Sequence, residues 1–174
     1  FHAAHKLADA LLAKQTVLHF RATYGPKVHG ACTLHSVTNR AQLRIFSVYS
    51  SVAGLLGSTG QASHAAANAW LSTMADCRRR LGVCGHSVAW GAVAEVGYAA
   101  RHGADRRAEQ SGMGAITRAA ALAAIWRLLV PGGRSFAVVA ADWPRLPAIA
   151  GETGGCLAPY AHLRGTARSS PAPA

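Results

Sequence analysis

Two apolar strands with a long alanine-rich helix between them form the middle of this chain, and they constrain its fold more than any other feature. Residues 42–50 are rich in Leu, Ile, Phe and Val without polar alternation, which predicts a strand covered on both faces. Residues 61–81 predict a long helix that ends before a glycine C-cap at Gly82. Residues 86–90 predict a second, short strand. A helix between two strands at this spacing is typical of a parallel βαβ unit, so we expect an α/β fold.

The segments on either side extend this alternation. Residues 7–24 have a loosely helical period that Pro26 interrupts, and residues 27–34 can restart as a helix. Residues 135–141 predict another strand of the buried type. The other elements expected are a loop at Gly54, Gly57 and Gly60, a mobile loop-helix element over residues 94–114, and a helix from the cap Thr117 to Val130. Within the long helix we expect a buried stripe of Ala66, Trp70, Met74, Cys77 and Leu81.

Composition narrows the class of protein. Eighteen Lys and Arg against seven acids give a net charge of +11, which attracts polyanions such as NADPH, phosphopantetheine or nucleic acid. The run Arg78-Arg79-Arg80 has no aromatic or zinc-finger pattern beside it, so a solvated helix end is favoured over a nucleic-acid patch. The cysteines Cys32, Cys77, Cys84 and Cys156 lack metal-ligand spacing, which predicts reduced thiols and no metal site. No apolar window is long enough to span a membrane, so we expect a cytoplasmic protein.

Four polar residues stand at spacings that suggest a site. Lys27 lies twenty-four residues before Ser51, and His64 lies thirteen residues after it. Asn68 follows His64 by four residues, so the two share one face of the predicted helix. A single serine at a strand end, or a single asparagine on a helix, is usually structural.

These positions resemble the active-site segment of ketoreductase domains from modular polyketide synthases and fatty acid synthases, members of the short-chain dehydrogenase/reductase superfamily. The stretch Phe46-Ser-Val-Tyr-Ser-Ser51 and the glycine-containing segment after it carry most of the likeness, and His64 stands where that family has a tyrosine. Further similar segments are Phe1-His-Ala-Ala-His5, Leu7-Ala8-Asp9, Pro26-Lys27-Val28-His29-Gly30, Ala89-Trp90-Gly91-Ala92 and Ala140-Ala141-Asp142-Trp143.

The resemblance implies a partial Rossmann-like fold, with a parallel sheet, flanking helices and no N-terminal dinucleotide-binding half. Residues 1–150 would form the C-terminal portion of a ketoreductase domain, and residues 151–174 a linker or tail. Gly54, Gly57 and Gly60 do not read as a phosphate loop, because they lack the Gly-x-Gly opening and follow the wrong strand.

The resemblance also implies roles for particular residues. Lys27, Ser51, His64 and Asn68 would be catalytic, Asp9, Leu56 and Gln61 would face the substrate, and Lys27, Gly91 and Ala92 would contact NADP(H). The substrate would be a β-ketoacyl thioester on an acyl carrier protein, and the other synthase domains would be partners. Asp9 together with Leu56 resembles the B-type pattern, which implies a D-configured hydroxyl product.

Two functions remain open at this point. The first is a fragment of an NADPH-dependent β-ketoacyl reductase that is impaired because an imidazole replaces the phenol proton donor, which contributes ~10²–10⁴-fold to rate in general acid catalysis. The tip of an imidazole ends roughly 2 Å short of the place where the phenol oxygen would sit. Since a hydrogen bond spans only ~3 Å, the imidazole would not reach a carbonyl placed for the phenol. The second is a noncatalytic structural remnant inside a synthase. A basic nucleic-acid-binding protein is a third and poorer interpretation.

Overall fold

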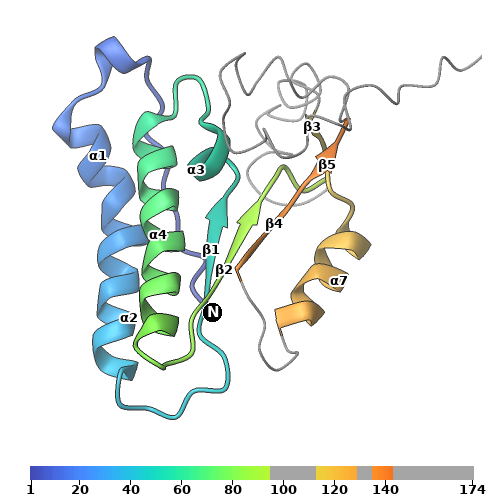
Figure 1. Cartoon of the computed structure of the whole chain (residues 1–174). Coiled ribbons are helices and arrows are strands. Elements are labelled where there is room, and N and C mark those ends of the chain that lie inside the picture. Colours follow the sequence, from blue (N-terminus) through green and yellow to red (C-terminus); the bar gives the residue numbers. More distant parts are fainter. Residues whose placement is uncertain (95–112, 129–134, 143–174) are drawn as a thin grey trace, which may run out of the picture.

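The computed structural model describes residues 1–94, 113–128 and 135–142. A three-stranded parallel sheet with helices on both faces organises this part of the chain (Figure 1). The elements are η1 (Leu12–Lys14), α1 (Val17–Tyr24), η2 (Gly25–His29), α2 (Gly30–Thr38), β1 (Ser47–Ser51), α3 (Ala53–Leu56), α4 (Ala62–Arg80), β2 (His86–Trp90), β3 (Met113–Gly114), α7 (Arg118–Leu128), β4 (Phe136–Val138) and β5 (Ala140–Ala141).

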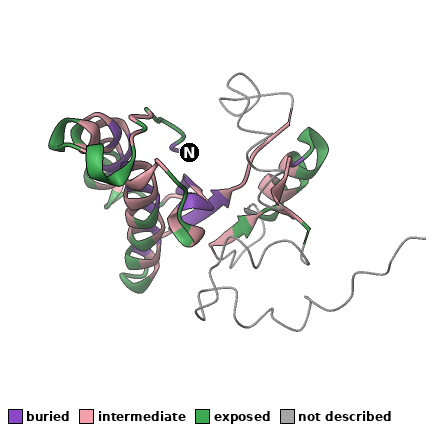
Figure 2. Ribbon diagram, turned by 90° about the horizontal axis from the view of Figure 1, so that it is seen from above, coloured by how far each residue is buried: buried purple, intermediate pink, exposed green. Residues whose placement is uncertain are grey.

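The sheet has the order β1-β2-β4, and both pairings are parallel, so the predicted α/β fold is confirmed. His2 adds a parallel bridge to Val48 on the outer side of β1. Helices α1, α2 and α4 lie on one face of the sheet, and α7 lies across the sheet from α4 (Figures 1 and 2). The central strands β1 and β2 are the most deeply buried elements, as parallel strands between two helical layers should be (Figure 2).

The predicted long helix is confirmed as α4, but its predicted buried stripe is wrong. Leu81 is 73% exposed, Cys77 is exposed, and the other three members of the stripe, Ala66, Trp70 and Met74, are only half-buried. The buried residues of α4 are Ser63, Ala67, Asn68, Leu71, Ala75 and Arg78. Small side chains allow the close approach of a helix to its neighbours, and a Cβ on Gly54 of α3 would lie only 2.8 Å from the main-chain nitrogen of Ala69. The buried face of α4 therefore combines small and polar residues with Leu71 and Arg78 and does not coincide with the predicted stripe.

The first helical segment begins later than its apolar pattern predicted. Residues 7–11 are not helical, and α1 starts after Thr16, whose main-chain N–H donates to His19 Nδ1 at 3.0 Å. Leu12 and Leu18 are 76% and 71% exposed, so the apolar period there does not mark a buried face in this part of the chain.

Pro26 does not end the helix, as its position predicted, but widens it. Residues Gly25–His29 form a single π-helical turn between α1 and α2, in which the Gly30 N–H donates to the carbonyl of Gly25. Proline lacks the N–H that a regular helix needs, and a wider turn accommodates this loss. The turn buries two successive residues, Lys27 and Val28, against the rest of the protein.

The glycine segment after β1 is only partly a loop. Gly54 lies inside the short helix α3, whereas Gly57 and Gly60 both adopt φ of +76°, the left-handed region that favours glycine. Gly82, the predicted C-cap glycine, has φ of +75° and follows Leu81, the residue after α4, so the predicted glycine end of this helix is confirmed.

For the C-terminal elements, the predicted secondary structure agrees with the structure better than the predicted burial does. Thr117 caps α7, since the Ala120 N–H donates to its hydroxyl at 3.2 Å. The single strand predicted over 135–141 is divided into β4 and β5, and none of its residues is buried. Within the described part, β4 is an edge strand that pairs only with β2, which explains its exposure. The predicted loop-helix element falls largely on residues 95–112, outside the described residues, and its last two residues form β3.

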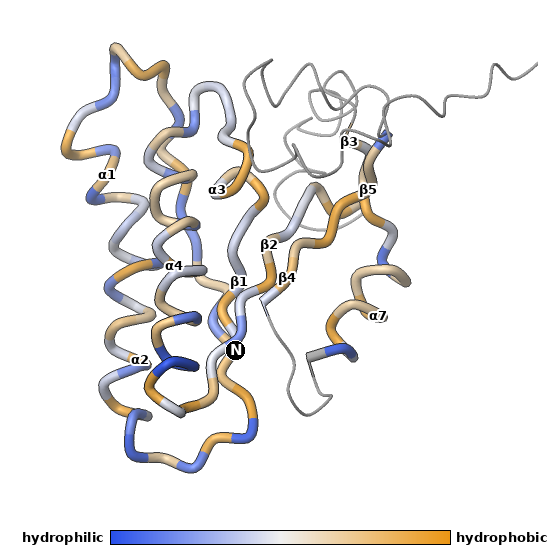
Figure 3. Tube along the Cα trace, viewed as in Figure 1, coloured by the Kyte–Doolittle hydropathy of each residue, from blue (hydrophilic) through white to orange (hydrophobic). Residues whose placement is uncertain are grey.

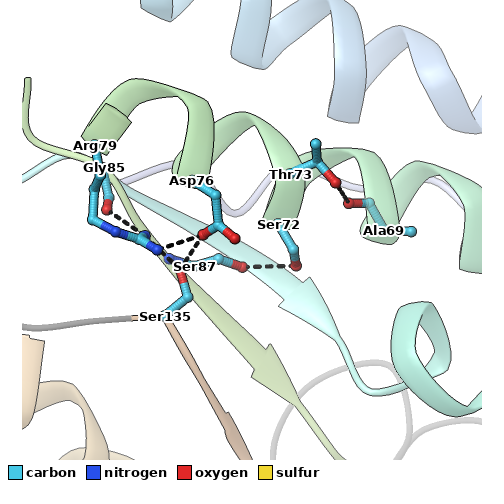
Figure 4. Close-up of polar contacts among 8 residues, drawn as sticks. All are labelled: Ala69, Ser72, Thr73, Asp76, Arg79, Gly85, Ser87 and Ser135. Carbon is cyan, nitrogen blue, oxygen red and sulfur yellow. Dashed lines mark hydrogen bonds and ion pairs between the residues drawn. The ribbon is translucent and has the colours of Figure 1, made fainter. Parts of the chain in front are cut away.

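Polar side chains join the C-terminal half of α4 to the sheet. Arg79 forms an ion pair with Asp76 at 2.6 Å and donates to the Ser135 hydroxyl at 2.9 Å, next to β4 (Figure 4). The hydrophilic end of α4 and the loop between α2 and β1 lie together at the lower end of the view, opposite to the carboxyl ends of β1 and β2 (Figure 3). The Arg78-Arg79-Arg80 run is therefore partly structural, because Arg78 is buried and Arg79 is held in this network.

No helix among the described residues is long and apolar enough to cross a membrane. Likewise, residues 1–94, 113–128 and 135–142 contain no group of three or more His, Cys, Asp or Glu side chains that could hold a metal ion. Cys32, Cys77 and Cys84 are free thiols, and Cys156 lies outside the described residues.

Candidate active site

The carboxyl ends of β1 and β2 define the edge of the sheet where the predicted site residues gather. Ser51 and Trp90 are register partners at these ends, and the Val52 N–H donates to the carbonyl of Trp90 at 3.0 Å. Open parallel sheets bind ligands outside the carboxyl ends of their strands. Ser51 therefore lies at the edge where an α/β fold places a ligand.

Lys27 and Asn68 meet in the interior. The Lys27 ammonium donates to Asn68 Oδ1 at 2.9 Å, although the two residues are forty-one positions apart. Asn68 is fully buried, and its Nδ2 donates to the main-chain carbonyl of His64 at 2.8 Å. The π-helical turn supplies the lysine and α4 supplies the asparagine. Two of the four candidate catalytic residues are therefore in direct contact.

His64 lies one helical turn before Asn68 on α4. Its Nδ1 atom is buried and has no hydrogen-bond partner within the described part of the chain. Burial and the Lys27 ammonium lower the pKa of His64 to about 4, with His5 acting in the same direction and Asp9 opposing it. Burial disfavours the charged imidazolium and a nearby cation adds repulsion. His64 is thus a neutral imidazole at neutral pH.

Lys27 is itself perturbed by its surroundings. The side chain is 4% exposed, and burial lowers the pKa of Lys27 to about 8. Burial and the same ammonium also lower the pKa of His5, which follows the strand-edge residue His2 in the chain. One ammonium therefore influences two histidines from different segments, which places Lys27 at the electrostatic centre of this region.

Ser51 makes a local contact only. Its hydroxyl accepts the Ala53 N–H at 3.2 Å at the start of α3, and it forms no hydrogen bond with Lys27, His64 or Asn68 in the described structure. The neighbouring Ser50 reaches the pair instead, because its hydroxyl donates to the main-chain carbonyl of Asn68 at 2.9 Å.

Ser50 is the end of a chain of hydroxyl groups that crosses from the sheet to α4. Its single proton goes to Asn68, so Ser72 must donate to Ser50 at 3.1 Å. Ser72 has then used its own proton, and Ser87 on β2 must donate to Ser72 at 3.0 Å (Figure 4). All three bonds point the same way, which strengthens each of them in a buried setting.

The predicted substrate-side residues come together in part. Gln61 donates from Nε2 to Asp9 Oδ2 at 3.0 Å, and Ala10 forms a parallel bridge with Gln61. Asp9 is exposed and Gln61 half-buried, so both groups are accessible to a ligand. Leu56 is half-buried at the end of α3 and makes no polar side-chain contact with either. Two of the three predicted substrate-side residues, Asp9 and Gln61, are thus in direct contact, and their facing a substrate stays a prediction.

The predicted cofactor positions Gly91 and Ala92 follow β2 directly. Gly91 donates its N–H to the carbonyl of Val138 at 2.9 Å, and Ala92 accepts the N–H of Ile116 at 2.7 Å. A Cβ on Gly91 would lie 3.2 Å from the Val138 oxygen, so the sheet itself requires a small residue there. The backbone contacts of these two residues are structural.

Two residues in this region were missed by the sequence interpretation. Ser50 has no motif of its own beside Ser51, and only its position one residue earlier on the same strand could have suggested a contact with α4. His2 lies in the segment Phe1-His-Ala-Ala-His5, but nothing in its spacing indicates that its imidazole contacts the main chain of Lys27 at 3.0 Å.

Comparison with known proteins gives the class of this fold. The KR domain family model matches residues 1–95, so the chain belongs to the KR domain family. Solved structures with the same fold include the first ketoreductase of the tylosin PKS, with a TM-score of 0.81, 35% identity, and coverage of 95% of this chain and 38% of that one. A structure of A-type ketoreductases from a modular polyketide synthase also has a TM-score of 0.81 and 35% identity, covering 85% of this chain and 32% of that one.

Curated relatives are polyketide synthases. Polyketide synthase GfsA of Streptomyces halstedii is 37% identical over 144 residues, which is 83% of this chain and 2% of that protein. The phthioceranic/hydroxyphthioceranic acid synthase of Mycobacterium tuberculosis (strain ATCC 25618 / H37Rv) is 42% identical over 96 residues, which is 55% of this chain and 4% of that synthase. The chain thus spans about a third of the similar solved ketoreductases and a few per cent of the synthases. It is similar to one segment of one domain of these proteins.

Proposed function

We propose that this chain is a piece of an NADPH-dependent reductase domain for β-ketoacyl thioesters, and that reduction is impaired because His64 stands at the proton-donor position. The observation that carries the proposal is the contact between the Lys27 ammonium and Asn68 Oδ1, one helical turn from His64. A buried lysine, an asparagine and a serine at the carboxyl edge of a parallel sheet are the supporting groups that carbonyl reduction needs.

Reduction of a ketone requires a hydride at the carbonyl carbon and a proton at the oxygen, where charge develops. A positioned acid with a pKa near the working pH delivers that proton, and fixed donors stabilise the developing alkoxide. Ser51 is available as a donor at the sheet edge, and Lys27 supplies positive charge nearby. His64 is a poor acid because burial and Lys27 keep it neutral, with a pKa of about 4. The supporting groups are present and the proton donor is the weak element.

The residues present fit the nicotinamide side of the cofactor and not its pyrophosphate side. Lys27 offers an ammonium, which suits the hydroxyl groups of a ribose, and the buried Nδ1 of His64 is left without a partner. Gly54, Gly57 and Gly60 do not make a phosphate loop, since Gly54 packs tightly against α4. NADPH, when bound to a complete domain, would supply the hydride. Binding of the cofactor by this chain alone is not proposed.

One observation favours a noncatalytic structural role as the second candidate. Both polar atoms of the Asn68 side chain have a partner inside the protein: its oxygen accepts from Lys27, and its amide nitrogen donates to the carbonyl of His64. A buried polar network of this kind can be retained because it fixes the packing of α4 against the π-helical turn. In that case the Lys27–Asn68 contact would stabilise the fold without serving a reaction.

The two candidates separate when a tyrosine is introduced at position 64. The test joins this chain to the nucleotide-binding half of a similar ketoreductase and compares the unchanged hybrid with its His64→Tyr variant. With a β-ketoacyl thioester and NADPH, we expect the variant to consume NADPH at least ~10²-fold faster, because a positioned acid contributes that much. Adding Lys27→Met to the variant is the matched control and should remove the gain. A variant that binds NADPH and does not reduce the thioester would refute the catalytic proposal and leave the structural one.

Substrate and stereochemistry follow from the same proposal. The substrate would be carried on an acyl carrier protein and handed on to other synthase domains. The Asp9–Gln61 pair would face it, and the B-type pattern of Asp9 with Leu56 predicts a D-configured product. Chiral analysis of the product from the His64→Tyr hybrid tests this, and an L-configured product would refute the B-type assignment.

A further inference from the structure

The imidazole of His2 contacts the main chain of Lys27, whereas Asn68 contacts its side chain. His2 Nε2 lies 3.0 Å from the Lys27 carbonyl oxygen, and the contact is buried. Because a carbonyl oxygen can only accept, His2 must donate from Nε2, which fixes the position of its proton. The imidazole is 7% exposed. This is a long-range, fully directional contact on the segment that presents the lysine.

His2 is itself rigidly held at the sheet. Its N–H donates to the carbonyl of Ser47 and its carbonyl accepts the N–H of Tyr49, both at 2.8 Å. These two bonds attach His2 as an added strand residue beside β1, with Val48 as its bridge partner. The imidazole therefore projects from the sheet onto the π-helical turn.

The π-helical turn has an outside contact at Lys27. An i to i+5 bond from the Gly30 N–H to the Gly25 carbonyl closes this turn, a form that is rare and occurs mostly as a single turn within a helix. Pro26 removes a further donor inside the turn. The bond from His2 to the Lys27 carbonyl ties this turn to the sheet at the very residue whose side chain enters the site.

Gly30 leaves the space that the imidazole occupies. A Cβ at position 30 would lie 3.0 Å from His2 Cε1 and 3.5 Å from Nε2. The nearby Gly25, in the same turn, has no atom within 4 Å of such a Cβ. The two glycines thus provide a matched pair, one needed for the contact with His2 and one not.

We infer that His2 is a positioning residue that acts through the carbonyl of Lys27 and, with Gly30, fixes the depth at which the lysine side chain enters the site. The catalytic role of Lys27 in this inference rests on the proposed function, whereas the positioning of Lys27 by His2 does not. The Lys27 ammonium bonds Asn68 of α4 and interacts electrostatically with His64 of α4 and with His5 from the segment after His2, and Asp9 acts on His64.

The pKa of Lys27 measures how deeply its ammonium is buried in solution. The sequence has three lysines, Lys6, Lys14 and Lys27, so ¹³C-lysine labelling of the whole chain gives a simple spectrum, and Lys27→Arg assigns the signal. Burial sets the pKa of Lys27 at about 8 in the unchanged protein. Removal of the His2 bond should let the turn relax and the ammonium reach water, so the pKa should rise toward the ordinary value of about 10.4.

Four variants test the inference. His2→Ala and Gly30→Ala should each raise the pKa of Lys27 by at least ~1 unit, a tenfold change in its acid dissociation constant. His2→Gln, whose amide nitrogen can replace Nε2 as donor, and Gly25→Ala should leave that pKa unchanged. Folded His2→Ala and Gly30→Ala proteins with an unchanged Lys27 signal would overturn the inference.

The inference can still be tested if His2→Ala and Gly30→Ala do not fold. His2→Gln then decides, since retention of both the melting temperature and the Lys27 pKa supports a donor role, and loss of either overturns it. The readout requires neither NADPH nor a ketone. A failed reduction assay therefore bears on the proposed function alone, and a failed titration bears on His2 alone.

Discussion

The Lys27 ammonium and the side-chain oxygen of Asn68 lie 2.9 Å apart in the interior, joining the π-helical turn to α4. Asn68 is the neutral group that stabilises a charge which burial otherwise disfavours. This one hydrogen bond contributes both to the stability of the fold and to the pKa of Lys27 in the candidate site.

Replacing Asn68 by alanine should therefore have two measurable effects. Loss of a hydrogen bond to a charged group should lower the free energy of unfolding by ~1.5–3 kcal/mol in urea denaturation. The pKa of Lys27 should fall below about 8, because the ammonium stays buried without its acceptor. The exposed Asn39→Ala is the matched control and should change neither quantity. An unchanged Lys27 pKa in the Asn68 variant would contradict this account of the pair.

His64 should make the fold sensitive to acid. Its pKa is about 4 in the folded protein and near 6.5 when unfolded, so below pH 6.5 the unfolded chain binds the proton first. Stability present above pH 6.5 is lost as the pH falls toward 4, by at most ~3 kcal/mol. Urea midpoints at pH 7 and pH 4.5 measure this loss. His64→Gln should reduce the acid sensitivity, and the exposed His29→Gln should not; equal losses in all three proteins would contradict the prediction.

The hydroxyl chain predicts opposite outcomes for two serines of β1. Ser50→Ala removes a donor to Asn68 and the acceptor of Ser72, and it should cost ~1–3 kcal/mol of unfolding free energy. Ser47 is equally buried, but its hydroxyl has no hydrogen-bond partner in the described structure. Ser47→Ala should therefore be neutral or slightly stabilising. Chemical denaturation of both variants checks the pair, and similar costs would show that the chain of hydroxyl groups contributes nothing.

Arg78 should be the most sensitive of the three adjacent arginines. Its side chain is 2% exposed, lies 3.8 Å from the centre of the Phe46 ring, and donates to the carbonyl of Cys84 at 2.7 Å. Arg78→Ala loses this packing and leaves the part-buried carbonyl of Cys84 without its donor, so we expect a cost of ~2–4 kcal/mol.

The exposed Arg80→Ala is the control and should stay within ~0.5 kcal/mol of the parent. Arg78→Lys should fall between the two, because an ammonium lacks the planar fork that reaches both Cys84 and His35. Thermal melts of the three proteins give the order, and equal melting temperatures for the Arg78 and Arg80 alanine variants would contradict it.

Sequence patterns predicted which segments form helices and strands better than they predicted which residues of those elements are buried. The helix α4 and the strands β1 and β2 follow from alanine content, apolar runs and Gly82, which are local signals. The buried face of α4 did not follow, because close approach to Gly54 rewards small residues over Trp70 and Met74. The half-buried edge strand β4 was likewise misjudged, since burial depends on neighbours that its own sequence does not record.

The candidate site shows the same division. The four-residue spacing of His64 and Asn68 predicted that they share a helix face, and the family resemblance grouped Lys27 with them, but the bond from Lys27 to Asn68 was not predicted. The support from His2 and Ser50 could not be predicted, because both contacts depend on how separate segments approach one another in space.

The π-helical turn at Gly25–His29 carries a consequence for changes in chain length. An α-helix rotates by about 100° per residue, so deleting one residue there would restore ordinary helical bonding while swinging everything on one side of the cut around the axis. Lys27 and Ala31, now both directed inward, could no longer face the core together. Insertions and deletions in this short stretch should thus be tolerated far less than the regularity of its flanking helices would suggest.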